Sequence, residues 1–336
     1  MEYTTLGKTG LRVSRMGFGG IPIQKVDAAV TRKLMERLVE RGVNYIDTAR
    51  GYTVSESFLG EALEGGLREK FVLATKSMAR TRAEMERDIE ISLRNLRTDH
   101  IDLYQVHNPS LAELEQVTAP DGALEALLAA KAAGKIGHIG VTAHMAAVFE
   151  KALTMDWVET VMFPYNIVET QGEALMQKCR EQNVGFICMK PMAGGALEDA
   201  RLAMRFIGRN ENVSVVIPGM YDVREIDQNI EAIEDASPLT EAERAQLDVI
   251  RRELGTQFCR RCNYCQPCTA GIAISGIFVL EGYLNRYGLG DWAKQRYAAM
   301  GKKAGDCVGC GACEKRCPYQ LPIRQMLARC KDEFGA

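Results

Sequence analysis

Eight short apolar segments alternate with helix-like segments over residues 15–234, and this alternation limits the fold more than any other feature. The predicted strands are residues 15–19, 43–46, 71–75, 101–106, 136–141, 158–163, 185–189 and 213–218. The segments between them carry apolar residues at helical spacing, as with Met85, Ile89 and Leu93. Eight strand–helix units in about 235 residues indicate an α/β fold, the (β/α)8 TIM barrel.

A doubly wound parallel sheet is the rival architecture for such an alternation. That fold normally carries a glycine-rich phosphate loop after its first strand, with the spacing GxGxxG and a helix that begins at once. Residues 17–20 read Gly-Phe-Gly-Gly, which lacks the spacing and opens no immediate helix. The barrel is therefore preferred. Residues 3–15, with two glycine-bearing turns, are expected to form a hairpin over the barrel floor.

The composition changes near residue 255, where the chain becomes rich in Cys, Gly and Arg. Just before this point, Thr240 and Glu243 have the capping-box spacing of a helix start. Three parts are therefore predicted: a barrel over residues 1–236, a linker helix over 237–254 and a cysteine-rich helical domain over 255–336.

Four polar side chains follow three successive strands of the predicted barrel. Asp47 and Tyr52 follow the second strand, Lys76 ends the third and His107 follows the fourth. The strand ends of a parallel barrel share one mouth, which is where chemistry occurs. An ammonium group lowers the pKa of a nearby phenol, so Lys76 would make Tyr52 a usable general acid. Asp47 would then hold Lys76, and His107 would bind a substrate oxygen.

Each of these residues has an ordinary structural interpretation when it is taken alone. A buried Asp–Lys pair is often structural, and a lone Tyr or His at a strand end is more often packing or surface. Four compatible residue types at three adjacent strand ends favour a catalytic site that reduces a carbonyl group.

Residues 1 to about 235 resemble the aldo-keto reductase superfamily. The matching stretches are residues 6–14 (LGKTGLRVS), 45–52 (YIDTARGY), 73–76 (LATK), 92–99 (SLRNLRTD), 102–107 (DLYQVH) and 217–219 (IPG). The resemblance implies a catalytic tetrad of Asp47, Tyr52, Lys76 and His107. It also implies hydride transfer between a nicotinamide cofactor, NADP or NAD, and the carbonyl carbon of an aldehyde or ketone.

The same resemblance implies a set of cofactor contacts. The set is Gly19, Asp47, Thr142, Asn166, Met189, Pro218, Gly219, Arg224 and Asn229. Departures from the usual pattern are Ala143 in place of Asn, Met162 in place of Gln, Met189 in place of an aromatic residue, and Met220-Tyr221 in place of Lys or Arg. A 2′-phosphate prefers charged partners, which Arg224 or Arg12 would supply. A flavin in the reshaped pocket stays an alternative.

Eight of the 11 cysteines lie in two groups after residue 255. The groups are Cys259, Cys262, Cys265 and Cys268, then Cys307, Cys310, Cys313 and Cys317. The second group has the spacing of bacterial ferredoxins, in which three close thiolates hold one [4Fe-4S] cluster and the fourth, before a proline, reaches the other. By that rule Cys317 joins the first three cysteines, and Cys268 joins Cys307, Cys310 and Cys313.

The first group departs from this pattern, because its last spacing is shorter and Thr269 follows in place of proline. Zinc is the alternative, but all-cysteine zinc sites use two CxxC pairs separated by a loop. Three cysteines at two-residue intervals, occurring twice, fit a cluster better. Residues 255–336 therefore resemble a two-cluster ferredoxin domain, with two helical segments expected between residues 271 and 303.

Charge and hydropathy exclude several classes of protein. Lys and Arg number 42 against 44 Asp and Glu, a net charge of −2 that gives no reason to expect nucleic acid or an anionic membrane as partner. The first residues have no apolar run typical of a signal peptide, and no stretch approaches the ~20 apolar residues of a membrane span. A cytoplasmic location is expected, with cysteines that bind metal instead of forming disulfides.

Three functional hypotheses follow. The leading one is an NAD(P)H-dependent aldo-keto reductase whose clusters carry electrons or support the structure. The second is a reductase coupled to an external ferredoxin or flavodoxin-type carrier, or to a flavin, with Arg260-Arg261 and Lys302-Lys303 as docking sites that equally suit a solvated surface. The third is a non-catalytic redox-sensing module. Substrate choice is assigned to loops that include residues 109–118 and 191–197.

Overall fold

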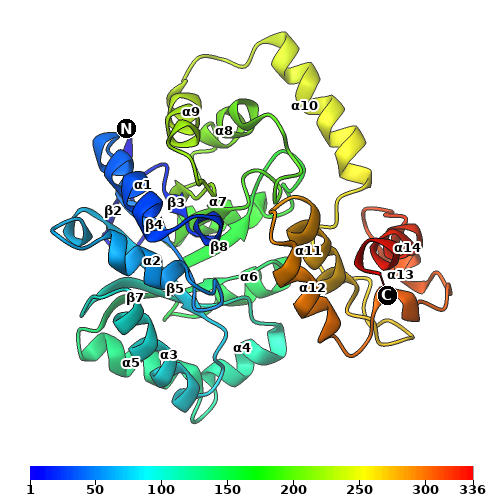
Figure 1. Cartoon of the computed structure of the whole chain (residues 1–336), viewed down its shortest axis with the longest axis horizontal. Coiled ribbons are helices and arrows are strands. Elements are labelled where there is room, and N and C mark those ends of the chain that lie inside the picture. Colours follow the sequence, from blue (N-terminus) through cyan, green and yellow to red (C-terminus); the bar gives the residue numbers. More distant parts are fainter. Residues whose placement is uncertain (336) are drawn as a thin grey trace. The chain divides into compact units, whose positions relative to one another are not determined.

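The computed structural model describes residues 1–335, and the chain forms two compact units (Figure 1). The barrel unit comprises Met1–Asn166, Thr170–Pro191 and Asp199–Pro238. The C-terminal unit comprises Ile167–Glu169, Met192–Glu198 and the described residues from Leu239 onward. The first two segments of the C-terminal unit come from loops inside the barrel sequence, which the sequence-based division into domains did not foresee.

Eight parallel strands form the sheet of the barrel unit. They are β3 (Phe18–Gly19), β4 (Tyr45–Asp47), β5 (Val72–Ser77), β6 (Ile101–Val106), β7 (Ile136–Thr142), β8 (Thr160–Pro164), β9 (Gly185–Met189) and β10 (Val215–Val216). The strands pair in chain order, and bridges from Met16 to Val216 and from Gly19 to Gly219 join the first strand to the last. This nearly closed barrel confirms the predicted fold class.

Helices lie outside the strands of the barrel unit, as Figure 1 shows. They are η1 (Pro22–Lys25), α1 (Ala28–Glu40), α2 (Ser55–Ala62), η2 (Arg68–Lys70), α3 (Arg82–Asn95), α4 (Leu111–Thr118), α5 (Ala123–Ala132), α6 (Ala146–Ala152), α7 (Glu173–Glu181), α8 (Ala200–Gly208) and α9 (Val223–Glu234). Helix α3 begins at a capping box of Thr81 and Glu84. Helix α4 was expected to be loop, but Ser110 and Glu113 cap its start in the same way.

The N-terminal hairpin lies at the start of the strands. Strands β1 (Tyr3–Thr5) and β2 (Arg12–Ser14) pair antiparallel, and Gly7 forms a bridge to Val184, just before β9. Gly7 has a φ of 54°, and a Cβ on it would lie 2.2 Å from the Gly185 nitrogen, so only glycine fits there. The hairpin therefore covers the floor of the barrel, as expected, and leaves the opposite mouth to the strand ends.

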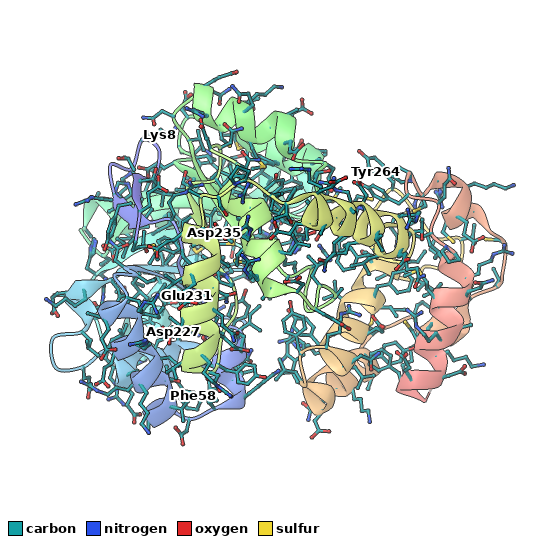
Figure 2. All side chains as sticks on the ribbon, turned by 90° about the horizontal axis from the view of Figure 1, so that it is seen from above. Lys8, Phe58, Asp227, Glu231, Asp235 and Tyr264 are labelled. Carbon is teal, nitrogen blue, oxygen red and sulfur yellow. The ribbon has the colours of Figure 1, made fainter. Side chains whose placement is uncertain are left out.

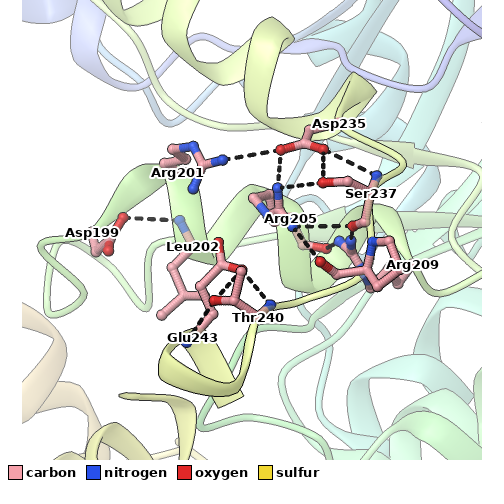
Figure 3. A network of polar contacts seen from close by, with 10 residues as sticks. Asp199, Arg201, Leu202, Arg205, Arg209, Asp235, Ser237, Thr240 and Glu243 are labelled. Carbon is pink, nitrogen blue, oxygen red and sulfur yellow. Dashed lines mark hydrogen bonds and ion pairs between the residues drawn. The ribbon is translucent and has the colours of Figure 1, made fainter. Parts of the chain in front are cut away.

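Ion pairs hold the last helices of the barrel unit. Asp227 of α9, labelled in Figure 2, pairs with Arg37 at 2.8 Å and Arg41 at 2.6 Å, both at the end of α1. Buried Arg205 of α8 pairs with Asp235 and donates to the carbonyl oxygens of Ser237 and Pro238 (Figure 3). These contacts fix the chain where it leaves α9.

The C-terminal unit is helical. Its elements are α10 (Glu241–Glu253), η3 (Leu254–Thr256), α11 (Ile274–Asn285), α12 (Gly290–Ala298), η4 (Ala304–Asp306), α13 (Ala312–Arg316) and α14 (Ile323–Phe334). Its core joins apolar residues of α11 and α14 to the cysteine loops, and the rings of Tyr297 and Phe334 stack with centroids 4.1 Å apart. Helices α11 and α12 fall between residues 271 and 303, where the sequence predicted two helical segments. No helix in residues 1–335 is long and apolar enough to cross a membrane.

Candidate active site

A buried ion pair forms the centre of the barrel mouth. Lys76 in β5 donates to a carboxylate oxygen of Asp47, at the end of β4, and to the Thr48 carbonyl oxygen at 2.8 Å. Both charged side chains are only 2% exposed. The strands are adjacent, with Asp47 in register with Ala74, so the two residues reach one another across a single strand spacing.

Tyr52 and His107 complete the arrangement that the sequence predicted. The Lys76 ammonium nitrogen lies 4.8 Å from the centroid of the Tyr52 ring. The rings of Tyr52 and His107 meet edge to face, with centroids 6.2 Å apart and an interplanar angle of 88°. The structure therefore brings together all four residues of the predicted tetrad, from the ends of β4, β5 and β6.

Burial disfavours both charges of the central pair. It raises the pKa of Asp47 and lowers the pKa of Lys76, while the attraction between the two groups opposes each shift. Gln105 of β6 also opposes the shift at Asp47, because its amide nitrogen donates to the second carboxylate oxygen at 3.1 Å. The charged state of this pair therefore depends on the hydrogen bonds that Asp47 accepts from Lys76 and Gln105.

His107 is held as a neutral imidazole. Burial lowers its pKa well below the usual value, and the positive charges of Lys76, Arg80 and Lys190 lower it further. Arg80 also donates to the His107 carbonyl oxygen at 2.9 Å, which fixes the backbone at the strand end. Within the described residues the Nδ1 atom of His107 has no hydrogen-bond partner. A neutral imidazole here can donate one hydrogen bond toward the mouth.

Gly19, Pro218 and Gly219 lie together where the first and last strands meet. The Gly19 nitrogen donates to the Pro218 carbonyl oxygen at 2.8 Å. A Cβ on Gly219 would lie 2.7 Å from Pro22, and one on Gly19 would lie 3.0 Å from the Ile217 carbonyl oxygen. Both glycines are therefore required by close packing against the protein's own atoms at this corner.

Three more predicted cofactor contacts lie at later strand ends. Thr142 ends β7, and its hydroxyl accepts from the Asn108 nitrogen at 2.9 Å. Asn166 follows β8, is buried and donates to the Lys190 carbonyl oxygen at 2.9 Å. Met189 ends β9 and is also buried. All three stand on the same mouth as the tetrad, since parallel strands end on one side.

Arg224 and Arg12, the residues expected to bind a 2′-phosphate, are less favourably placed for their role than the other predicted cofactor contacts. Arg224 is highly exposed and pairs with Asp222 at 2.8 Å, so its charge is already matched. Arg12 lies in the floor hairpin, with its guanidinium 4.7 Å above the Tyr3 ring. The sequence reasoning missed Lys25, whose ammonium lies 5.1 Å above the ring of Tyr221.

Asn229, the last predicted cofactor contact, is buried in α9, and the departures from the family pattern are buried as well, except for the exposed Tyr221. Ala143, Met162 and Met220 are buried in the barrel unit. Met162 and Met189, a fourth departure, belong to the apolar cluster in the barrel interior. These methionines therefore serve as core packing, and Met189 also stands at the end of its strand.

The eight clustered cysteines line two cavities of the C-terminal unit. The first cavity is lined by Cys259, Cys262, Cys265 and Cys317, and the second by Cys268, Cys307, Cys310 and Cys313. The three remaining cysteines, Cys179, Cys188 and Cys330, are buried elsewhere. The structure thus brings together the two crossed sets that ferredoxin spacing predicted.

The two cavities differ in their surroundings. Cys310 in the second set is exposed, and Val308 beside it is 69% exposed. In the first set no cysteine is exposed, and Phe278 and Leu321 also line the cavity. No group of three His, Cys, Asp or Glu side chains in residues 1–335 could hold a single metal ion. The four-thiol lining suits an iron–sulfur cluster.

Arg260 and Arg261 correct the expectation of a solvated or docking surface. Arg260 is 8% exposed, donates to the Val168 carbonyl oxygen at 2.9 Å and stacks 3.9 Å above the Tyr319 ring. Arg261 pairs with the fully buried carboxylate of Glu169. Both guanidinium groups therefore bind partners inside the C-terminal unit, and the prediction of an exposed basic pair at residues 260–261 is wrong.

Comparison with known proteins agrees with this geometry. Residues 15–201 match the model of the Aldo/keto reductase family, and residues 258–322 match a 4Fe-4S dicluster domain. The chain is 32% identical over 228 residues to "Uncharacterized oxidoreductase YrpG" of Bacillus subtilis, covering 59% of this chain and 68% of that protein. It is 29% identical over 224 residues to "Aldo-keto reductase YhdN" of the same organism, covering 59% and 66%.

A solved structure gives the same result. Aldo-keto reductase AKR11C1 from Bacillus halodurans, in its holo form, superposes with a TM-score of 0.65 at 26% identity, covering 74% of this chain and 96% of that one. The family match spans more than half of the present chain. The chain therefore belongs to the Aldo/keto reductase family, as an oxidoreductase with a C-terminal 4Fe-4S dicluster domain.

Proposed function

We propose that this protein reduces an aldehyde or ketone by hydride transfer from NAD(P)H, with Tyr52 as the general acid. The observation that carries the proposal is the buried Asp47–Lys76 pair, with its ammonium group 4.8 Å from the centroid of the Tyr52 ring. A phenol beside a buried cation gives up its proton more readily than one in water. Family membership supports a nicotinamide cofactor over the flavin alternative.

Each residue of the tetrad has one role in the proposed reaction. Lys76 keeps a positive charge near Tyr52, and Asp47 holds Lys76 in place. Tyr52 donates its proton to the carbonyl oxygen of the substrate. His107, neutral at physiological pH because of its lowered pKa, donates a hydrogen bond to the same oxygen. These roles place an acid and a donor around one reacting atom, which is the arrangement that a carbonyl reduction requires.

The nicotinamide cofactor would lie along the strand ends from β7 to β10. Thr142, Asn166 and Asn229 offer polar groups, and Gly19, Pro218 and Gly219 would lie along the phosphates of the cofactor. When bound, the cofactor supplies the hydride. Lys25, which lies over the ring of Tyr221, is a candidate cation for a 2′-phosphate, because Arg224 is paired with Asp222. We expect NADP to be accepted on this basis, with NAD as the alternative.

Two [4Fe-4S] clusters would occupy the cysteine-lined cavities of the dicluster domain. The first would be held by Cys259, Cys262, Cys265 and Cys317, and the second by Cys268, Cys307, Cys310 and Cys313. Four thiolates around each cavity are the donor set that such a cluster requires.

The exposed cysteine of the second set favours a further role in electron transfer. A cluster passes one electron at a time, whereas a nicotinamide gives two as hydride, so the two do not couple directly. Cys310 and Val308 would leave the second cluster open to an external carrier of the ferredoxin or flavodoxin type. We propose this carrier as a partner of the second cluster.

Replacement of Tyr52 by Phe tests the leading proposal. The variant should lose about 10²–10⁴-fold in kcat for reduction of small aldehydes by NAD(P)H, because the acidic proton is gone. Cofactor binding, followed by fluorescence, should persist. Tyr3→Phe, in the floor hairpin, is the matched control and should keep wild-type activity. A Tyr52→Phe protein with full activity would exclude Tyr52 as the acid.

The protonation of His107 gives a pH test. Its lowered pKa means that the folded protein keeps the ring neutral far below pH 6.5, where a free histidine would be protonated. In NMR spectra of protein labelled at histidine, one of the 4 histidines should show no titration between about pH 8 and pH 5.5. That signal should vanish in His107→Gln. A His107 signal with a midpoint near 6.5 would contradict the neutral ring.

The crossed cysteine sets can be separated by substitution. A protein with Cys307, Cys310 and Cys313 all changed to Ser should retain about four irons per chain in the first cluster. Adding Cys317→Ser should remove that cluster, because the fourth thiolate is lost, whereas adding Cys268→Ser should leave it intact. Iron and sulfide analysis gives the answer. If instead Cys268→Ser empties the site, each cluster uses its own sequence group.

The carrier proposal predicts how the clusters are reduced. NAD(P)H alone should give no EPR signal from a reduced cluster, whereas a reduced ferredoxin should give one. Val308→Glu should slow reduction by that acidic carrier roughly tenfold, because it adds a like charge at the contact. Reduction by dithionite should be unchanged, and Val249→Glu on α10 is the control. Equal rates in the two variants would place the contact elsewhere.

A further inference from the structure

Both oxygens of the Asp47 carboxylate accept hydrogen bonds from donors on the next two strands of the sheet, β5 and β6. Lys76 of β5 donates to one oxygen, and the Gln105 amide of β6 donates to the other at 3.1 Å. Gln105 is in register with Lys76 and is fully buried. The carboxylate therefore has a neutral donor on one oxygen and a cationic donor on the other.

The orientation of the Gln105 amide follows from its partner. A carboxylate accepts hydrogen bonds, so the amide nitrogen faces Asp47, and the reverse orientation would bring two oxygens together. Within the described residues the amide oxygen of Gln105 has no partner. A buried amide with one unmet oxygen is costly to keep. The contact with Asp47 is thus the single hydrogen bond that the structure records for this side chain.

The neighbouring strand makes room for this side chain. Gln105 pairs in register with Gly140 of β7, and a Cβ on Gly140 would lie 3.2 Å from the Gln105 Cγ. A larger residue at position 140 would press on the amide. The same glycine also faces the Thr160 hydroxyl, which would lie 2.2 Å from such a Cβ. The packing of β7 therefore favours the extended reach of Gln105 toward Asp47.

We propose that Gln105 is a positioning residue of the tetrad, whose amide keeps Asp47 ionised and directed at Lys76. The proposal rests on the proposed function, since it concerns the same four residues. Gln105 touches neither Tyr52 nor the substrate in this scheme and acts only through Asp47.

The physical reason is the balance between a charged pair and a neutral pair. A proton that passes from the Lys76 ammonium to the Asp47 carboxylate leaves two neutral groups, and burial favours that state. The Gln105 hydrogen bond stabilises the carboxylate and so keeps the proton on Lys76. Without it, more of the protein holds an uncharged Lys76, which no longer promotes ionisation of Tyr52.

Other charged and titratable groups act on the same pair. Burial lowers the pKa of Lys76, and the charge of Glu56 opposes this shift. Burial and the charge of Asp47 raise the pKa of Tyr45, whereas burial and the charge of Lys76 lower the pKa of His107. None of them is changed in the test below, so their contributions are common to all variants.

The test is a titration of Tyr52 that does not depend on turnover. Tyrosinate absorbance near 295 nm is recorded against pH, and the Tyr52→Phe spectrum in the same background is subtracted, which also removes the common cluster absorption. In Gln105→Met, which keeps the length of the side chain but lacks the donor, the Tyr52 midpoint should move up by roughly 0.5–1 pH unit. An unchanged midpoint would overturn the proposal.

Thr160→Val is the matched control. It removes another buried polar group of the barrel interior, on β8, that has no hydrogen-bond partner within the described residues. In this variant the pH midpoint of the Tyr52 titration should not move, and kcat should stay within twofold of the wild-type kcat. A shift in Thr160→Val equal to that in Gln105→Met would show general disturbance of the barrel and would also overturn the proposal.

Kinetics provide the second measurement. In Gln105→Met, kcat for carbonyl reduction should fall about 10-fold or more while KM changes little, because the substrate contacts are intact. If Gln105→Met does not fold, Gln105→Asn serves in its place, since its amide is one methylene too short for Asp47. If neither the wild type nor any variant reduced a carbonyl, the proposed reaction would be refuted. A raised Tyr52 midpoint in Gln105→Met would still support the positioning role of Gln105.

Discussion

The buried ion pair between Lys76 and Asp47 imposes the main constraint on this protein. Taking two charges out of water costs several kcal/mol for each ion, and their attraction offsets this only when further hydrogen bonds complete the site. Here the Thr48 carbonyl and the Gln105 amide supply those bonds. The barrel provides the necessary precision, because three adjacent strands present their side chains at fixed spacing. A less regular scaffold would let water in or leave one charge unpaired.

The sequence allowed much of the fold and of this site to be predicted, for identifiable reasons. The barrel follows from eight repeats of the same strand–helix pattern, so an error in one segment matters little. The tetrad follows because each member stands where an apolar strand ends, and such positions share a mouth. The strand limits were less certain. Only Phe18–Gly19 and Val215–Val216 form strand in the first and last segments, which are both shorter than predicted.

Other features could not be predicted, because they depend on contacts between distant parts of the chain. Gln105 lies inside the largely buried strand β6, and only the approach of Asp47 from β4, two strands away, gives it a role. An amide in a buried strand was the available signal. Arg260 and Arg261 looked like surface residues, yet their partners are a carbonyl and a carboxylate from residues 168–169. The same contacts explain why short loop segments of the barrel sequence belong to the C-terminal unit.

The crossed lining of the two cysteine cavities has a consequence for biosynthesis. Each cavity takes three cysteines from one end of the domain and one from the other, so neither is complete while residues 307–317 are still inside the ribosome. A nascent chain that ends before Cys317 lacks one of the four cysteines that line the first cavity. Metal insertion must therefore wait for nearly the whole polypeptide, and a premature stop near the end would damage the earlier half of the domain as well as the later one.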